Sequence, residues 1–150
     1  MAAGSASAAN SLNAGSVALN VGMDRVTPLI AGKYSISKDM AILGGLGFQS
    51  AGPNGRKETT LALLAGVRKY LKTDDFAPFV GGVFQYSTTS GTPSSSTTSL
   101  LAEFGAEYFL AKQFSIEGKA RFGFGSEDNA GAKTSTFGTS TAGVGVNYYF

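Results

Sequence analysis

The sequence predicts an all-β fold, an eight-stranded antiparallel up-and-down β-barrel, and three observations predict it. From Gly15 onward, apolar residues alternate with small or polar ones at period two, and no window carries a sustained helical stripe. Glycine is abundant, with 21 residues in 150, while charged residues make up only 15% of the chain. Connections of different lengths follow one another between the alternating segments, which is typical of a series of hairpins.

Composition excludes several other classes of protein. A hydrophobic fraction of 43% is too high for a disordered chain, and no apolar run reaches the roughly 18 residues of a spanning helix. The net charge of +2 comes from scattered residues without a basic stripe, so nothing favours nucleic acid as a partner. A length of 150 residues is room for one domain.

The chain divides at residue 14. Residues 1–14 are almost all Ala, Ser, Gly and Asn without a period, which predicts a flexible N-terminal tail. Residues 15–150 carry the alternation and make up the predicted barrel.

Four strands are expected in the first half of the barrel, at residues 16–23, 29–36, 40–49 and 61–68. Successive side chains of a strand point to opposite faces, so an apolar face appears as every second residue. This face is formed by Val17, Leu19, Val21 and Met23 in the first strand, by Met40, Ile42, Leu46 and Phe48 in the third, and by Leu61, Leu63, Ala65 and Val67 in the fourth. The alternate positions hold mostly small residues.

Four more strands are expected at residues 77–87, 100–110, 114–124 and 143–150. The fifth is apolar on both faces, and we assign Val80, Phe84 and Tyr86 to its outward face. Pro78 fits the start of this strand, because proline cannot donate a ladder hydrogen bond. The apolar faces of the last three strands are Leu100, Ala102, Phe104, Ala106, Tyr108 and Leu110; Phe114, Ile116, Ala120, Phe122 and Phe124; and Val144, Val146, Tyr148 and Phe150.

The connections suggest two different ends of the barrel. Residues 37–39, 72–75 and 111–113 are predicted to be tight charged turns. Residues 50–58, 88–98 and 126–135 are predicted to be longer polar loops at the opposite end of the barrel. The fourth connection at that end, residues 24–27, is short. Long loops at one end and tight turns at the other are typical of an up-and-down barrel.

Period two leaves open whether the apolar face points into a core or out into lipid. A soluble ligand-binding barrel would have an outer face rich in Lys, Glu, Thr and Gln. Here the polar face is mostly Gly, Ala and Ser with a few charges, which suits the narrow interior of an eight-stranded barrel. Aromatic residues lie near strand ends on the apolar face, and strands of about 9–11 residues match a tilted membrane span. A transmembrane barrel is therefore the favoured interpretation, with the soluble barrel as an alternative.

Residues 15–150 resemble the small eight-stranded outer-membrane barrels of Gram-negative bacteria, such as the OmpA membrane domain and OmpX. Gly145, Tyr148 and the terminal Phe150 match the C-terminal signature that the barrel-assembly machinery reads, while Gly143 stands where that signature usually has a polar residue. A segment at 66–68, a turn, and 77–81 look like a hairpin common in this family. The resemblance implies a location in the bacterial outer membrane, contact with its lipid, and the barrel-assembly machinery as a partner during insertion.

Seven charged residues fall on the predicted lumen face: Lys33, Arg68, Lys119 and Arg121, and Glu103, Glu107 and Glu117. If the turn between the sixth and seventh strands is centred on Lys112, Glu103 lies across from Arg121 and Glu107 across from Glu117. Lys119 is then a diagonal neighbour of both glutamates and relieves the like-charge pair. Two interpretations remain: a pairing network that fills a narrow barrel, or a gate or selectivity ring.

Catalysis has little support in this sequence. The chain has neither histidine nor cysteine, and its serines cluster in predicted loops without a fixed base nearby. We therefore predict no catalytic, metal or cofactor site. The predicted function is a non-enzymatic outer-membrane barrel with a structural or surface-interaction role; a small or gated pore is the first alternative and a soluble ligand-binding β-barrel the second. No surface ligand can be named.

Overall fold

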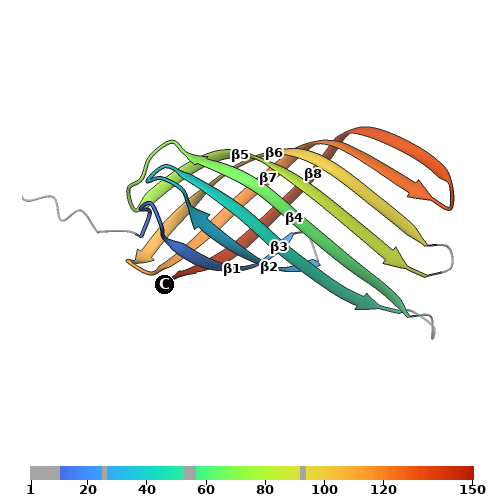
Figure 1. Ribbon diagram of the computed structural model, residues 1–150, viewed down its shortest axis with the longest axis horizontal. Helices are drawn as coiled ribbons and strands as arrows, with labels where there is room; N and C mark the ends of the chain where they lie inside the picture. Colours follow the sequence, from blue (N-terminus) through green and yellow to red (C-terminus); the bar gives the residue numbers. More distant parts are fainter. Residues whose placement is uncertain (1–10, 25–26, 53–56, 92–93) are drawn as a thin grey trace, which may run out of the picture.

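The computed structural model describes residues 11–24, 27–52, 57–91 and 94–150, and these form one closed antiparallel barrel (Figure 1). Each strand pairs with its neighbours in the chain, and β1 pairs with β8 to close the barrel. The strands are β1 (Val17–Asp24), β2 (Thr27–Ser35), β3 (Met40–Ala51), β4 (Glu58–Tyr70), β5 (Phe76–Ser90), β6 (Ser95–Ala111), β7 (Phe114–Asn129) and β8 (Ala132–Tyr149). No helix among these residues is long and apolar enough to span a membrane. The predicted fold class is confirmed.

The predicted phase of the strands is also confirmed, including that of the ambiguous fifth strand. In β5, Val80, Phe84 and Tyr86 point outward and are 36–49% exposed, whereas Phe79 and Val83 point inward and are 1% exposed. Large apolar side chains are exposed on the outside of all eight strands. On β6 and β7 this apolar exterior runs over residues 100–110 and 114–124, about the length that a tilted strand needs to cross hydrocarbon. The exterior is therefore that of a membrane-spanning barrel.

The prediction of three long loops is wrong for most of these residues, because the strands continue through them. β5 extends to Ser90 and β6 begins at Ser95, so the Ser/Thr tract at 88–98 is mainly a hairpin. β7 and β8 are joined by Ala130 and Gly131, whose φ angles of 52° and 94° make a tight turn. Threonine has a high strand propensity, so a polar Ser/Thr tract can continue a sheet once neighbouring strands template it. The third predicted loop shrinks in the same way, since β3 reaches Ala51 and β4 starts at Glu58.

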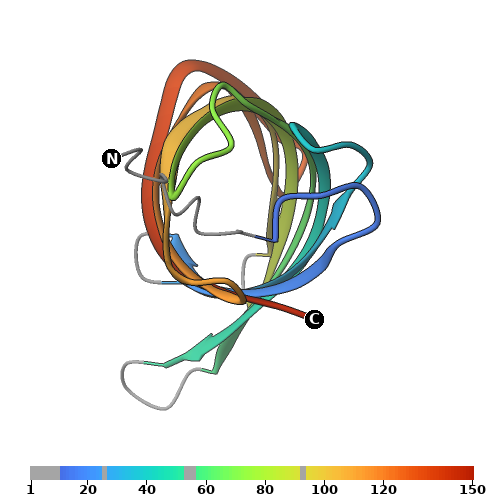
Figure 2. The same ribbon diagram turned by 90° about the vertical axis from the view of Figure 1, so that its left-hand side faces the viewer.

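Six strands continue past the closed part of the barrel. β1 pairs with β8 only over residues 143–149, and β2 pairs with β3 only over 41–47. Beyond these pairs the described sheet runs from β3 to β8 and is open between its two outer strands (right in Figure 1). We call this region the extension; it comprises residues 49–51, 58–60, 85–90, 95–99, 125–129 and 132–136. Viewed along the barrel, the end of the β3–β4 hairpin leaves the outline of the wall (Figure 2).

The three tight turns lie at the opposite end, as predicted, over residues 36–39, 71–75 and 112–113. This end of the lumen contains an apolar cluster of Leu12, Ala18, Ala41, Tyr70, Ala77, Phe79, Phe109 and Tyr149. A second apolar cluster of Leu29, Leu64 and Val83, with Leu43 packed against it, lies nearer to the extension. Charged side chains occupy the lumen between the two clusters.

The structure corrects the predicted flexible tail at its C-terminal part. Residues 1–10 lie outside the described residues, but Leu12 is 1% exposed and packs inside the barrel mouth. Ser11 donates a hydrogen bond from Oγ to the carbonyl of Lys112 (2.7 Å), and the amide of Gly15 donates to the carbonyl of Ser35 (2.7 Å). A single leucine in a polar segment gives little signal in the sequence, because its burial depends on the shape of the barrel mouth.

Candidate functional site: the charged lumen

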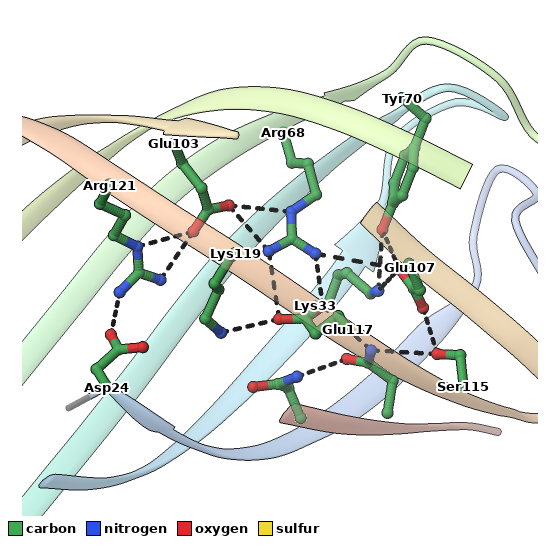
Figure 3. A network of polar contacts seen from close by, with 12 residues as sticks. Asp24, Lys33, Arg68, Tyr70, Glu103, Glu107, Ser115, Glu117, Lys119 and Arg121 are labelled. Carbon is green, nitrogen blue, oxygen red and sulfur yellow. Dashed lines mark hydrogen bonds and ion pairs between the residues drawn. The ribbon is translucent and has the colours of Figure 1, made fainter. Parts of the chain in front are cut away.

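All seven charged residues predicted to face the lumen do so, and each is 0–8% exposed. They come from four strands: Lys33 from β2, Arg68 from β4, Glu103 and Glu107 from β6, and Glu117, Lys119 and Arg121 from β7. The strands position them by simple alternation, since each lies one residue away from an outward apolar side chain. Figure 3 shows that they form one connected network.

Arg68 is the centre of this network. Its Nε and Nη2 donate to Oε1 of Glu103 at 3.1 and 2.9 Å, and its Nη1 donates to Oε2 of Glu117 at 2.8 Å. The guanidinium also lies 3.6 Å from the centroid of the Phe79 ring. The planar, five-donor guanidinium can bind two carboxylates and stack on a ring at once, which lysine cannot do.

Glu107 accepts four hydrogen bonds at a completely buried position. The donors are Lys33 Nζ (2.8 Å), Tyr70 OH (2.6 Å), Ser115 Oγ (2.5 Å) and Tyr149 OH (2.7 Å). A carboxylate offers about four lone-pair positions, so its acceptor capacity is used. This satisfaction offsets the cost of burying the charge.

The predicted register between β6 and β7 is confirmed. Glu103 lies opposite Arg121 and accepts from its Nε at 2.8 Å, and Glu107 lies opposite Glu117. Lys119 binds Glu117, with Nζ 2.8 Å from Oε1, as predicted. Glu107 pairs with Lys33 from β2, which the prediction did not pair with it, and Nη1 of Arg68 lies 4.0 Å from its Oε2.

Sequence reasoning missed Asp24, which we had assigned to a turn. Asp24 is the last residue of β1, and its carboxylate forms an ion pair with Nη1 of Arg121. The lumen charges of the described residues then balance: four cations, Lys33, Arg68, Lys119 and Arg121, face four anions, Asp24, Glu103, Glu107 and Glu117. The alternation of the first strand could have revealed Asp24, because it lies two and four residues after the inward positions Gly22 and Asn20.

Polar uncharged residues extend the network across the β1–β8 closure. Asn20 donates from Nδ2 to Oδ1 of Asn147 at 2.7 Å. Asn147 in turn donates to Ser115 Oγ and to Glu117 Oε2, both at 3.1 Å. The strands that close the barrel are therefore joined by side chains as well as by the backbone ladder.

Two glycines of β8 make room for this network. A Cβ at Gly143 would contact the carboxylate of Asp24 and would lie 3.3 Å from Cε of Lys119. A Cβ at Gly145 would lie 2.9 Å from Nδ2 of Asn20. The departure from the family signature at Gly143 thus has a local reason: a polar side chain there would displace the Asp24–Arg121 ion pair.

The lumen is packed like a protein core. Among the described buried side-chain nitrogen and oxygen atoms, only Ser35 Oγ lacks a hydrogen-bond partner. The described part of the chain contains no group of three or more His, Cys, Asp or Glu residues that could hold a metal ion. The arrangement is chemically suited to filling the barrel with paired charges.

Comparisons with known proteins identify the fold. No protein-family model matches the chain, and no curated protein sequence matches it. Among solved structures, the N-terminal β-barrel domain of Pseudomonas aeruginosa OprF is similar, with a TM-score of 0.52 and 12% identity over 90% of this chain and 96% of that one. A major outer membrane protein from Thermus thermophilus has a TM-score of 0.48 and 13% identity, over 90% and 98% of the two chains. Acinetobacter baumannii CarO has a TM-score of 0.46 and 10% identity, over 94% and 100%.

The likeness to the OprF barrel agrees with the closed topology of this chain. The described residues add an apolar exterior and a charged interior. The two faces follow from the alternation in the sequence. With the closed topology they describe a barrel whose apolar outer surface faces lipid and whose interior holds paired charges. The chain therefore has the fold of the small eight-stranded barrels of the bacterial outer membrane.

Proposed function

We propose that this protein is a non-enzymatic outer-membrane barrel with a structural or surface-interaction role, in which a closed barrel anchors the extension outside the membrane. The observation that carries the proposal is the filled lumen. Four cations and four anions pair within it, and apolar clusters lie on both sides of them. A passage for ions or solutes would require this core to open.

Opening the lumen would be costly. Arg68 pairs with both Glu103 and Glu117, so moving it would leave each of these buried carboxylates with one cation fewer. Breaking one side of a buried ion pair costs about 3–5 kcal/mol. Leu12 would also have to leave the barrel mouth for a continuous path to form on that side. These costs favour a barrel that stays closed.

The extension supports a role at the surface. Its strands carry mostly Ser and Thr, and hydroxyl groups join neighbouring strands, as between Thr60 and Thr89 (3.0 Å). β8 presents exposed residues throughout 132–138 and has no described partner on the β1 side there. A sheet raised above the membrane in this way offers backbone and hydroxyl groups to molecules outside the cell.

The C-terminal residues Gly145, Tyr148 and Phe150 remain our candidate for the signal that the barrel-assembly machinery binds. Tyr148 and Phe150 are 47% and 75% exposed on the outside of the barrel, and their rings are in edge-to-face contact at 5.3 Å. An assembly factor could therefore reach both rings from the membrane side.

Conductance in planar bilayers tests the proposal against the pore alternative. We expect the wild type to be electrically silent and Arg121→Ala to produce openings, because the variant removes the cation between Glu103 and Asp24. Lys69→Ala is the matched control: it also removes one positive charge, but from a half-exposed side chain paired with Asp39 at the turn end. If the wild type conducts steadily and Arg121→Ala changes only ion preference, the protein is a pore.

A further inference from the structure

A groove of about 460 Å³ lies on the outer surface of β5 to β8, where the apolar exterior meets the extension. Its apolar part is one row of side chains in register across the four strands. Phe84 lies opposite Leu100, Leu100 opposite Phe124, and Phe124 opposite Phe137. All four are 49–66% exposed, so the row is open to the surroundings of the barrel.

The rings of this row are fixed by their neighbours. Phe137 contacts Phe124 with ring centroids 4.8 Å apart, and it meets Phe122 edge to face at 5.2 Å. Gly138, with a φ of 94°, forms a bulge in β8 that turns Phe137 outward in line with Phe124. Without this extra residue, Phe137 would point toward the inside of the sheet.

The next row toward the outside is made of hydroxyls. Thr98 lies opposite Ser126, and Ser126 lies opposite Ser135. None of the described residues that line the groove is charged. On the same face, one row further out, Asp128 lies opposite Lys133, so these two charges add no net charge beside the groove.

We propose that this groove binds the uncharged sugar headgroup of a glycolipid in the outer leaflet. The C–H face of a sugar packs on a phenyl ring, whose face carries partial negative charge, and its hydroxyls exchange hydrogen bonds with Ser and Thr. A phosphate would instead need cations, which the lining lacks.

The position of the groove indicates that the sugar belongs to a lipid and is not a free saccharide. The apolar row is continuous with the lipid-facing surface of β5 to β8, and the hydroxyl row begins where that surface ends. A headgroup on the hydroxyls would leave its alkyl chain on Leu100 and Phe124. The assignment rests on the proposed placement of the barrel in the outer membrane.

Binding can be measured by amide chemical shifts of the barrel refolded in phosphatidylcholine bicelles. Octyl maltoside, which carries an uncharged sugar on one alkyl chain, should shift the amides at 98–100, 124–126 and 135–137 in a saturable way. Free maltose should bind at least about fivefold more weakly, because it lacks the contact with the apolar row. Octyl phosphate should cause no saturable shift at these amides.

Two variants remove the groove's recognition groups while keeping the fold. Phe137→Leu removes the ring, and Ser126→Ala with Ser135→Ala removes two hydroxyls; each should weaken octyl maltoside binding about fivefold. Phe48→Leu with Ser50→Ala removes one ring and one hydroxyl from the exposed outer face of β3 and should leave binding unchanged. Mobility shift on boiling verifies that every variant has folded.

Three results would overturn the assignment. Equal binding of free maltose would show that no lipid is required, and equal binding of octyl phosphate would show that the sugar is not recognised. Equal loss in the β3 control would show that the groove is not the site. Each of these leaves the conductance of the barrel untouched, so the failure of this inference is distinct from a failure of the proposed function.

Discussion

Asp24 forms its ion pair with Arg121, which lies 97 residues away in the chain. Arg121 reaches it through Nη1 while its Nε and Nη2 bind Glu103, so one guanidinium bridges two carboxylates. Glu103 keeps a second cation in Arg68, but Arg121 is the only described cation paired with Asp24. The two carboxylates therefore respond differently to the loss of Arg121.

Replacing Arg121 with Ala should destabilise the barrel by about 3 kcal/mol, because it leaves Asp24 nearly buried without its cation. Urea unfolding in vesicles, followed by circular dichroism, measures the change. Combining Arg121→Ala with Asp24→Asn should recover most of the loss, and combining it with Glu103→Gln should recover a smaller part. Strictly additive losses in both double variants would mean that these side chains do not pair.

At the scale of elements, the turns and the strand ends differ in what fixes them. The turn between β2 and β3 is closed by side chains: Ser37 Oγ donates to Asp39 Oδ1 at 2.7 Å, and Lys69 of β4 forms an ion pair with the same carboxylate. These contacts, with that from Lys69 first, lower the pKa of Asp39 below its usual value. The group lies outside the membrane-spanning strands and is solvent-exposed.

The lowered pKa of Asp39 predicts a pH dependence of stability. A carboxyl group with a depressed folded pKa stabilises the barrel above its unfolded pKa, and this contribution is lost as the pH falls through the folded value. Wild type should thus unfold at slightly higher urea than Asp39→Asn at pH 7, and the two should converge in acid. Asp75→Asn, which removes a charge from another turn, serves as the control. A difference that persists in strong acid would contradict this account.

The end of β8 carries the predicted assembly signal. Deleting Phe150 should slow insertion in cells, because an exposed recognition ring is lost. Refolding into detergent should change little, since the deletion removes one backbone hydrogen bond, from the Phe150 amide to the carbonyl of Val17 (3.0 Å), and an exposed side chain. Pulse-chase assembly in cells and refolding on gels measure the two rates. Normal assembly of the truncated protein would remove Phe150 from the signal.

At the scale of the whole molecule, the even strand number puts both ends of the barrel chain on one side of the membrane. The turns at 36–39, 71–75 and 112–113 share that side, and the extension lies on the other. In the outer membrane the turns should face the periplasm and the extension the medium.

Single cysteines at Ser94 and Lys112 test this orientation, since the chain has no cysteine of its own. Both residues are exposed, in the connection between β5 and β6 and in the turn between β6 and β7. A membrane-impermeant maleimide should label the cysteine at position 94 in intact cells, and the one at 112 only after the outer membrane is permeabilised. Labelling of both in intact cells would rule out the proposed topology.

The sequence by itself determined the strand number, the two faces and the inward direction of the seven lumen charges. These depend on local alternation, because a strand turns every second side chain to the same face whatever its neighbours are. The pairing of Glu103 with Arg121 also followed from the sequence, since a tight turn fixes the register of adjacent strands.

Only the tertiary structure decided which distant groups meet and where the strands end. Arg68 reaches Glu103 and Glu117 across the lumen because closure of the barrel brings nonadjacent strands within side-chain reach. Leu12, which precedes the first strand, joins the same buried cluster as Tyr149. The Ser/Thr tract at 88–98 became a hairpin because neighbouring strands supplied backbone partners that its own composition does not reveal. Local alternation fixes the face to which each side chain points, whereas contacts across the lumen and along the sheet depend on the closed geometry of the whole barrel.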